Sequence, residues 1–261
     1  MIPAVIPPLT GLSVLVTRPL PQGEHLAAAI TQQGGEAHVL AAIAINPLPA
    51  QLNDTYDLVV FVSAHAVEHG AALIVRTDSM RIAAIGNATA AALKIAGLDA
   101  NLVPEQGFRS EDLLAHPDLN IQTHSRVLIV RGRGGRELLR ETFTMHGCHV
   151  DVLEVYERAL PQWDAVRRDE LEDAWASGGI HAVTATSVQT LQNLKSLLSE
   201  RGNQLLASTP LVMPSARIAE AAIELGLRGD RILALGADDE SIVNALARWH
   251  ARARMSAIRA G

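Results

Sequence analysis

Three arginines, Arg131, Arg133 and Arg136, stand in a glycine-rich turn within the stretch RVLIVRGRGGRELLRETF, which runs from Arg126 to Phe143. A strand that enters a helix through glycines directs free backbone N–H groups and the positive helix end toward one place, which suits phosphate or carboxylate. The turn lacks the Lys-Ser/Thr ending of a Walker loop and the G-x-G-x-x-G spacing of a dinucleotide loop. We therefore expect an anion other than a nucleotide, which weakens the case for a nucleotide-dependent transferase.

Arginines follow predicted strands in three loops, and they have two interpretations. They could be solvated residues in ordinary surface ion pairs. Because arginine is mildly unfavourable near a positive helix end, a carboxylated ligand held by the guanidinium groups would explain their placement. We favour ligand binding for Arg18 and Arg131, leave both interpretations open for Arg136 and Arg217, and expect Arg133 to face solvent.

Serine and threonine stand where helices are expected to begin. N-capping explains such hydroxyls in general. A ligand carboxylate could also accept hydrogen bonds from the N–H groups that the hydroxyl would otherwise cap, so structural and binding roles both remain open. The residues concerned are Ser63, Thr89, Thr186, Ser187 and Ser215.

Histidine and cysteine give little indication of a metal site. His65 and His69 lie four residues apart on one face of a predicted helix, but no third ligand is evident. His146 and His149 straddle a helix end and a strand start, so their side chains should diverge. We expect packed or solvated histidines and no metal. The single Cys148 excludes an internal disulfide and fits a reducing cytoplasm.

The composition limits the class of protein and of ligand. A chain of 261 residues can form two α/β domains, and two domains usually form a cleft. Hydrophobic residues make up 48% but aromatic residues only 3%, which favours a core of Ala, Val, Ile and Leu under helix-covered parallel sheets. The net charge of −6 argues against a nucleic-acid partner. We expect a cytoplasmic protein, since MIPAVIPPLTG lacks a basic leader and no run of about 18 apolar residues occurs.

The elements that must position these residues alternate along the chain. From Leu12 onward, short β-branched runs alternate with Ala/Leu-rich helical patterns, which is typical of parallel α/β units. Predicted helices end in glycine at Gly34-Gly35, Gly97, Gly147 and Gly226, where a left-handed cap is expected. The predicted strands are Ser13–Thr17, Ala37–Leu40, Leu58–Val62, Arg81–Ile85, Val127–Val130, Val150–Val155, His181–Thr184, Leu211–Met213 and Arg231–Leu235.

Two extended segments that end in proline, Ala41–Pro49 and Leu153–Pro161, bracket a central block of domain size. We interpret them as paired linkers. The first domain would then be discontinuous, formed by residues 11–41 and 159–261, with residues 42–158 inserted as the second domain.

An internal echo supports this division. AIGNATAAALKIAGL and VMPSARIAEAAIELGL both predict a strand, a turn of small residues, an Ala-rich helix and Gly-Leu. Upstream of each, FVSAHAVEH and VTATSVQTL both predict a strand that opens into a hydroxyl-bearing helix start. The same order of elements is therefore predicted in both domains, although the general alternation of strands and helices in α/β proteins could produce the same similarity.

Tyr156, one of two tyrosines, lies on the second linker, where it would face the space between the domains. A half-buried strand tyrosine is usually structural. In a cleft, its hydroxyl could instead donate a proton or a hydrogen bond to a leaving group.

The ordered motifs VLVTRP, VFVSAHAVEH, AIGNATAAALKIAGL, VRGRGGRELLRETFTMHGCHVDVLEVYERALP and MPSARIAEAA resemble the uroporphyrinogen-III synthase family, from Leu12 to about Trp249. The resemblance implies two α/β domains of Rossmann-like or flavodoxin-like type with parallel sheets, joined by a two-stranded β connector. It also implies a lyase that cyclises the linear tetrapyrrole hydroxymethylbilane to uroporphyrinogen III in haem biosynthesis. Water is lost and ring D is inverted through a spiro intermediate, without a metal or an organic cofactor.

The resemblance also implies site residues. Tyr156 matches the family's VY tyrosine and is the candidate that assists departure of the hydroxyl, which favours its functional interpretation. Ser63, Gly86, Asn87 and Thr89 match the loops expected to line the cleft. The turn residues Arg131, Gly132 and Arg136, with Arg18, would hold carboxylate arms. PSAR and ATSVQ depart from the family pattern, so Thr186, Ser187, Ser215 and Arg217 are expected substrate contacts whose roles stay open.

One alternative class is a non-catalytic two-domain binding protein that closes on an acidic small molecule. Such receptors are normally exported, so the lack of a recognisable leader counts against it. For the enzyme we expect a monomer that contacts neighbouring pathway enzymes only transiently and binds neither nucleic acid nor membrane.

Overall fold

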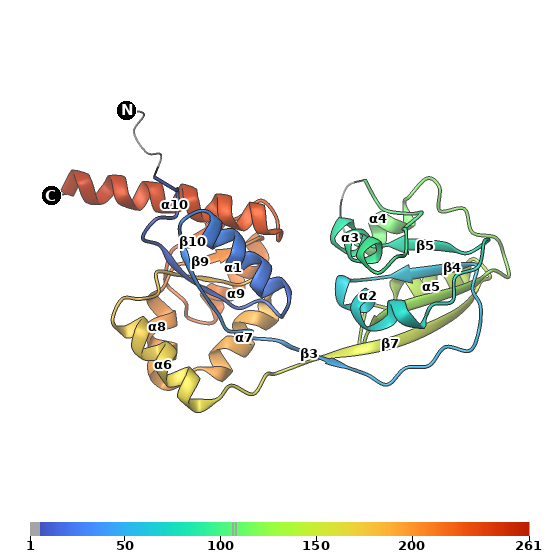
Figure 1. Cartoon of the computed structure of the whole chain (residues 1–261), viewed down its shortest axis with the longest axis horizontal. Helices are drawn as coiled ribbons and strands as arrows, with labels where there is room; N and C mark the ends of the chain where they lie inside the picture. The colour runs from blue at the N-terminus through green and yellow to red at the C-terminus, as the bar shows by residue number, and fades with distance from the viewer. Residues whose placement is uncertain (1–5, 106, 108, 261) are drawn as a thin grey trace. The chain divides into compact units, whose positions relative to one another are not determined.

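The computed structural model describes residues 6–105, 107 and 109–260, so the first five residues of the N-terminal stretch considered above lie outside it. The chain forms two compact units: unit 1 comprises Met1–Ala44 and Ala159–Gly261, and unit 2 comprises Ile45–Arg158. The chain passes between the units within β3 (Ala44–Pro47) and β7 (His149–Ala159), which are neighbours in one sheet (Figure 1). These strands form the expected two-stranded connector.

Unit 1 is a parallel sheet covered by helices on both faces. Its strands are β1 (Ser13–Val16), β2 (Glu36–Val39), β8 (Ala182–Thr184), β9 (Leu211–Met213) and β10 (Arg231–Leu233), in the order β10-β9-β8-β1-β2. Every neighbouring pair in this order is parallel. Its helices are α1 (Gln22–Gln32), α6 (Ala165–Ala176), α7 (Val188–Leu197), α8 (Glu200–Ser208), α9 (Ala216–Glu224) and α10 (Asp239–Ala260).

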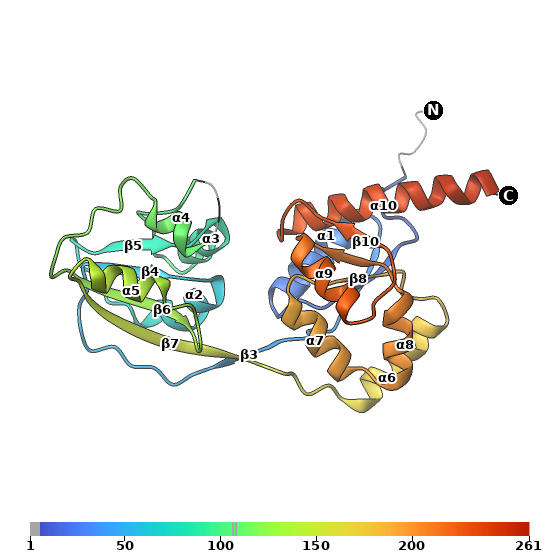
Figure 2. The same ribbon diagram turned by 180° about the vertical axis from the view of Figure 1, so that it is seen from behind.

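Alternation along the strands of unit 1 divides its core between the two faces of the sheet. Val14 and Val16 pack with α1 and α10, whereas Leu15 packs with residues of α6, α7, α8 and α9. Successive strand side chains point to opposite faces, so an almost continuous apolar strand supplies both cores. Figure 2 shows α1 and α10 on one side of this unit and α6, α7 and α8 on the other.

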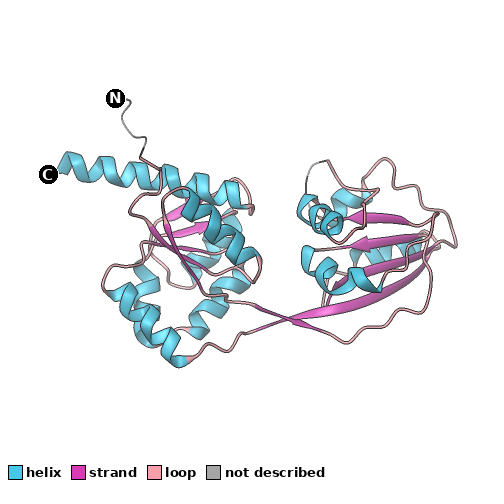
Figure 3. Cartoon of the chain, in the orientation of Figure 1, coloured by secondary structure: helices cyan, strands magenta, loops and turns pink. Residues whose placement is uncertain are grey.

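Unit 2 has the order β3-β7-β6-β4-β5, with β4 (Leu58–Phe61), β5 (Arg81–Ala84) and β6 (Arg126–Gly132) between helices (Figure 3). The pairs β4–β5, β4–β6 and β6–β7 are parallel. The helices are α2 (Ala64–Gly70), which continues into a 3₁₀ turn at Ala71–Leu73, α3 (Asn87–Ile95), α4 (Ser110–Leu114) and α5 (Leu138–Met145). Buried residues of α2 and α3 cover one face and those of α4 and α5 the other.

The two units repeat one connectivity. Unit 2 runs β4-α2-β5-α3 and β6-α5-β7, and unit 1 runs β8-α7-α8-β9-α9 and β1-α1-β2. In both sheets the first strand of the longer run lies beside the first strand of the shorter run. The parallel bridge between Ala83 and Leu102 in unit 2 then occupies the place that β10 has in unit 1. The two similar sequence segments, AIGNATAAALKIAGL and VMPSARIAEAAIELGL, therefore form equivalent elements, β5-α3 and β9-α9.

Every predicted strand overlaps an observed strand, and the α/β class with parallel sheets is confirmed. Several strand ends differ from the predicted ones by a residue or two, and two differences bear on the site. The segment around Ala44–Pro47, expected as a linker, pairs as β3, and β7 continues past Val155 so that Tyr156 lies within the sheet. The predicted glycine caps are confirmed, since Gly34, Gly97, Gly147 and Gly226 all have φ between +77° and +83°.

Candidate functional site

Tyr156 and Ser63 meet at the carboxyl edge of the sheet in unit 2. Tyr156 pairs with Gly132, the last residue of β6, and Ser63 follows β4 at the same edge. Their hydroxyl oxygens lie 3.1 Å apart, within hydrogen-bonding distance. Only 3% of Tyr156 is exposed, so little solvent competes with Ser63 for its hydroxyl. Ligands of open α/β sheets bind at this edge.

Ser63 also begins α2. Its extended backbone directs the hydroxyl oxygen to accept the N–H of Ala66 at 3.0 Å, an ordinary N-cap. That bond uses the serine oxygen as acceptor and leaves its hydrogen available for Tyr156. When Ser63 donates to the phenol oxygen, the hydrogen of Tyr156 is available to a third group. The cap and a chemical role for Ser63 are therefore compatible.

Gly132 makes room for the ring of Tyr156. A Cβ at Gly132 would lie 2.5 Å from Cζ, 2.6 Å from Cε2 and 2.9 Å from Oη of that ring. Atoms in ordinary contact lie 3.4–4 Å apart, so no residue with a side chain fits without moving the ring. The glycine serves this close approach; its φ is not positive.

Two histidines of α2 border the same ring. The centroids of His65 and His69 lie 5.7 Å and 6.1 Å from that of Tyr156. Burial lowers the pKa of His65, although its Nδ1 lies 3.3 Å from Oε2 of Glu68. A neutral imidazole therefore packs beside the phenol near neutral pH. The packed interpretation of His65 is confirmed.

The arginine turn after β6 binds carboxylates of the protein's own side chains. Arg131 is buried, with Nη2 at 2.8 Å from Glu137 and 3.4 Å from Glu154. The N–H of Gly134 donates to the same oxygen of Glu154 at 3.3 Å. The bond from Arg131 lowers the pKa of Glu137. In this structure, Glu154 of β7 occupies the position where a ligand anion was expected.

The other arginines of the turn also face carboxylates. Arg133 lies 2.6 Å from Glu157, and Arg136 forms two bonds with Glu111, at 2.5 and 3.1 Å. Both arginine side chains are more than half exposed, as expected for Arg133. Exposed pairs of this kind are weak because water screens the charges, so a carboxylated ligand could replace them at little cost.

The start of α3 carries the other predicted residues of unit 2. Gly86 precedes the helix and no side chain caps it, while its carbonyl accepts the N–H groups of Thr89 and Ala90 at 3.1 and 3.0 Å. Asn87 is exposed and Thr89 is buried. This uncapped helix start offers its first N–H groups to an anion.

In unit 1, Arg18 ties the loop after β1 to the start of α10. It is 7% exposed and bonds the carboxylate of Asp239 and the carbonyl of Ala237. Burial lowers the pKa of Arg18, and Asp239 opposes that shift. A structural ion pair therefore accounts for Arg18 in this structure.

The remaining predicted site residues lie at the starts of α7 and α9, of which only α7 has a side-chain cap. Ser187 caps α7 by accepting the N–H of Thr190 at 3.0 Å, and Thr186 beside it is half-buried. Ser215 precedes α9 without capping it. Arg217 is exposed, and no other residue of the described chain pairs with its guanidinium. Ser215 and Arg217 are therefore the predicted contacts of unit 1 whose polar groups the fold leaves available.

Sequence reasoning missed the partners of the arginines and the packing of Tyr156 against its neighbours. In the structure, parallel pairing sets Arg131 beside Glu154 and Gly132 beside Tyr156. Opposite charges on the two strands are a signal for the Arg131–Glu154 pair alone, because the Gly132–Tyr156 contact follows a register shift between Arg131 and Gly132. Asp239 carried no comparable signal, since it lies far from Arg18 in sequence.

Within the described residues, no group of three or more His, Cys, Asp or Glu side chains could hold a metal ion. No helix among them has the length and apolar character needed to cross a membrane.

The chain has two open α/β units that are connected twice. They carry hydroxyls, uncapped helix starts and a phenol at the carboxyl edges of their sheets, the edges at which proteins of the open α/β class bind ligands. A family model described as uroporphyrinogen-III synthase HemD matches residues 24–242. The chain belongs to the uroporphyrinogen-III synthase family. The resemblance inferred from the sequence motifs is thus confirmed.

Relatives and solved structures agree with this family. The chain is 35% identical over 252 residues to the uroporphyrinogen-III synthase of Salmonella typhimurium, covering 90% of this chain and all of that protein. It is equally identical over 253 residues to that of Escherichia coli, with the same coverage.

The fold is similar to two solved synthases. One, a mutant from Thermus thermophilus, gives a TM-score of 0.52 at 18% identity, covering 94% of this chain and 99% of that one. The other, from Helicobacter pylori, gives 0.57 at 15% identity, with 89% and 96% covered. At these identities the likeness supports the fold alone.

Proposed function

We propose that this chain closes hydroxymethylbilane, a linear tetrapyrrole, to uroporphyrinogen III with loss of water and inversion of ring D. Membership of the uroporphyrinogen-III synthase family carries this proposal. It supports the enzyme and gives no support to the alternative, a non-catalytic binding protein. No step of this closure needs a redox change, so residues that bind, orient and move a proton suffice.

The chemistry divides into leaving-group departure and ring closure. The electron-rich pyrrole stabilises the cation that forms when the hydroxymethyl group departs as water. That departure needs a proton or a hydrogen bond on the leaving oxygen. Closure without help gives the uninverted isomer, so an enzyme must fix the shape of the spiro intermediate.

We assign the hydrogen bond on the leaving oxygen to Tyr156. Its phenol is nearly buried and bonds Ser63 at 3.1 Å, and its ring packs closely against Gly132. With Ser63 as donor to the phenol oxygen, the phenol hydrogen is directed elsewhere. A phenol held in this way is positioned before the substrate arrives, which favours the transition state over the ground state.

We further propose that helix starts and free hydroxyls hold the eight carboxylates of the substrate. In unit 2 the uncapped start of α3 at Gly86, with Asn87 and Thr89, has donors to offer. In unit 1, Ser215 and Arg217 at α9, with Thr186 and Ser187 at α7, are the corresponding candidates. Backbone N–H groups at such places bind carboxylates without a net positive surface.

The arginines contribute differently under this proposal. Arg217 binds a carboxylate directly, and Arg136 does so by exchanging Glu111 for the substrate. Arg18 and Arg131, buried with their own carboxylates, orient the loops at the two edges. Because exposed ion pairs are weak, exchange at Arg136 costs little.

The test is the isomer ratio. Hydroxymethylbilane generated in situ is allowed to close with and without the purified chain, and the uroporphyrinogens are separated as isomers I and III. We expect isomer III to dominate only when the chain is present, without added metal or nucleotide. An unchanged ratio would reject the assignment.

A further inference from the structure

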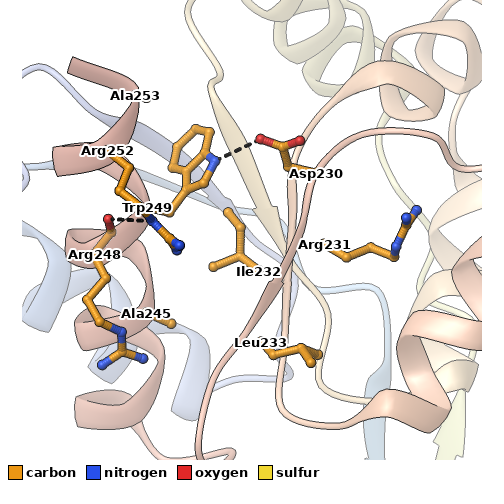
Figure 4. Close-up of a pocket in the computed structure, with 9 residues that line it drawn as sticks. All are labelled: Asp230, Arg231, Ile232, Leu233, Ala245, Arg248, Trp249, Arg252 and Ala253. Carbon is orange, nitrogen blue, oxygen red and sulfur yellow. Dashed lines mark hydrogen bonds between the residues drawn. The ribbon is translucent and has the colours of Figure 1, made fainter. Parts of the chain in front are cut away.

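An open groove of about 410 Å³ lies between the edge strand β10 and α10 in unit 1, away from the residues discussed above. Ile232 and Trp249 line it, and the indole N–H of Trp249 donates to Asp230 at 3.0 Å (Figure 4). Arg248 and Arg252 line it from the helix side. The groove therefore combines the apolar side chain of Ile232 and the indole of Trp249 with two arginines and the carboxylate of Asp230.

The strand bordering the groove has a free edge. Asp230 and Ala234 direct their backbone groups to β9, through the carbonyl of Asp230 at 2.8 Å and the N–H of Ala234 at 2.9 Å. Alternate residues of a strand face opposite neighbours, so the N–H and C=O groups of Arg231 and Leu233 face outward. β10 is the last strand of the sheet on this side.

The equivalent edge of unit 2 is closed. Leu102, at the place that β10 holds in unit 1, is 1% exposed and packs in one cluster with Leu113 of α4. Leu233 is 52% exposed and Leu235 is 90% exposed. An edge with unpaired backbone groups and exposed leucines is a template for an added strand.

The basic side chains around the groove favour an added strand that carries negative charge. From Ser241 to the chain end there are four arginines and no Asp or Glu, in a chain whose net charge is −6. Arg248 stands on the helix side, while the side chains of Arg231 and Leu233 point away from the helix (Figure 4). No side chain of the described residues forms an ion pair with Arg231 or Arg248. Both faces of an added strand would thus meet an arginine.

We propose that this groove, formed by β10, Trp249 and Arg248, docks an extended acidic segment of a partner protein as an additional strand. The backbone groups of Arg231 and Leu233 pair with the segment. Its carboxylates meet Arg231 and Arg248, and its apolar side chains contact Trp249 and Leu233. A second copy of this chain is disfavoured, since it would bring the same arginines to the same groove.

The test uses the whole chain labelled with ¹⁵N and a synthetic peptide of about six residues in which pairs of Glu alternate with a pair of Val, so that each face of the added strand carries carboxylates and an apolar side chain. We expect slowed amide exchange at Arg231 and Leu233, a shifted Trp249 indole signal, and binding that weakens as salt rises. The same peptide with Lys in place of Glu should not bind. The double variant Arg231→Glu/Arg248→Glu should bind about tenfold more weakly. Arg254→Glu, on α10 outside the groove, is the matched control and should bind normally.

Several results would overturn the proposal. They are unchanged exchange at Arg231 and Leu233 with saturating peptide, equal binding of the lysine peptide, or equal binding by the double variant. Protection that rises with protein concentration alone would identify a second copy as the occupant, and equal shifts with anionic lipid vesicles would identify a membrane surface. The isomer ratio of the double variant serves as the folding control, since neither arginine belongs to the proposed catalytic site.

Discussion

Replacing Gly132 by alanine should displace the phenol of Tyr156 without altering any polar side chain. The new Cβ would lie 2.5 Å from Cζ and 2.6 Å from Cε2, whereas ordinary contacts begin at 3.4 Å. The ring must therefore move by about 1 Å, because Gly132 and Tyr156 are paired across two strands and their backbones cannot separate easily.

A shift of that size would disturb the 3.1 Å bond between Ser63 and Tyr156 and displace the phenol hydroxyl from its position. Misplacing a reacting group by about 1 Å costs roughly 100-fold in turnover. Overpacking should also reduce the free energy of unfolding by about 1–3 kcal/mol. We expect Gly132→Ala to lower kcat by about two orders of magnitude and to change KM little.

The assay is steady-state formation of isomer III, with urea unfolding as the measure of stability. The control is the same substitution in a Tyr156→Phe background, where the hydroxyl is already absent and Gly132→Ala should lower kcat little further. Wild-type kcat in Gly132→Ala would refute the reasoning, as would an undiminished loss of about 100-fold when Gly132→Ala is added to Tyr156→Phe.

Three further outcomes are expected. Ser63→Ala should lower kcat about tenfold and the free energy of unfolding by about 1 kcal/mol, because it removes both the bond to Tyr156 and the cap of α2. Asp164→Ala removes only a helix cap, the bond to Val166 at 3.1 Å, and should lower stability alone. Equal kcat in the two variants would contradict this expectation. Burial lowers the pKa of His65, so the unfolded chain takes up the proton first as the pH falls and the free energy of unfolding decreases below about pH 6.5. In urea titrations, His65→Gln should reduce the dependence of this free energy on pH. An identical pH dependence would exclude His65 as its source. Arg18→Ala should lower the free energy of unfolding by about 1–3 kcal/mol, while Arg217→Ala should raise KM without changing stability, and the reverse pattern would exchange their proposed roles.

The fold could be predicted because its signals are local. Strands such as Val127–Val130 are β-branched and apolar, and glycines such as Gly97 and Gly226 end helices with positive φ. Each signal depends on a few neighbouring residues, so it can be recognised without knowledge of the tertiary structure. The hydroxyl at Ser63 was located at a helix start for the same reason.

The contacts of the site could not be predicted to the same degree, because they depend on register between distant strands. Whether Arg131 meets a ligand or Glu154 is decided by the pairing of β6 with β7, including a register shift between Arg131 and Gly132. Arg18 meets Asp239 from the opposite end of the chain. The positions of the arginines after predicted strands suggested an arginine-lined site, whereas the structure pairs most of those arginines with carboxylates of the chain itself.

The two tyrosines of unit 2 allow a direct test of the central claim that the Tyr156 hydroxyl assists loss of water. Tyr56 is also buried, but it precedes β4, bonds Asp151 at 3.0 Å, and burial raises its pKa to about 12. The measurement is the ratio of isomer III to isomer I formed by Tyr156→Phe and by Tyr56→Phe at equal concentration. We predict that Tyr56→Phe retains the wild-type ratio, while Tyr156→Phe is slow enough for unassisted closure to isomer I to prevail. A wild-type ratio and rate in Tyr156→Phe would contradict the account.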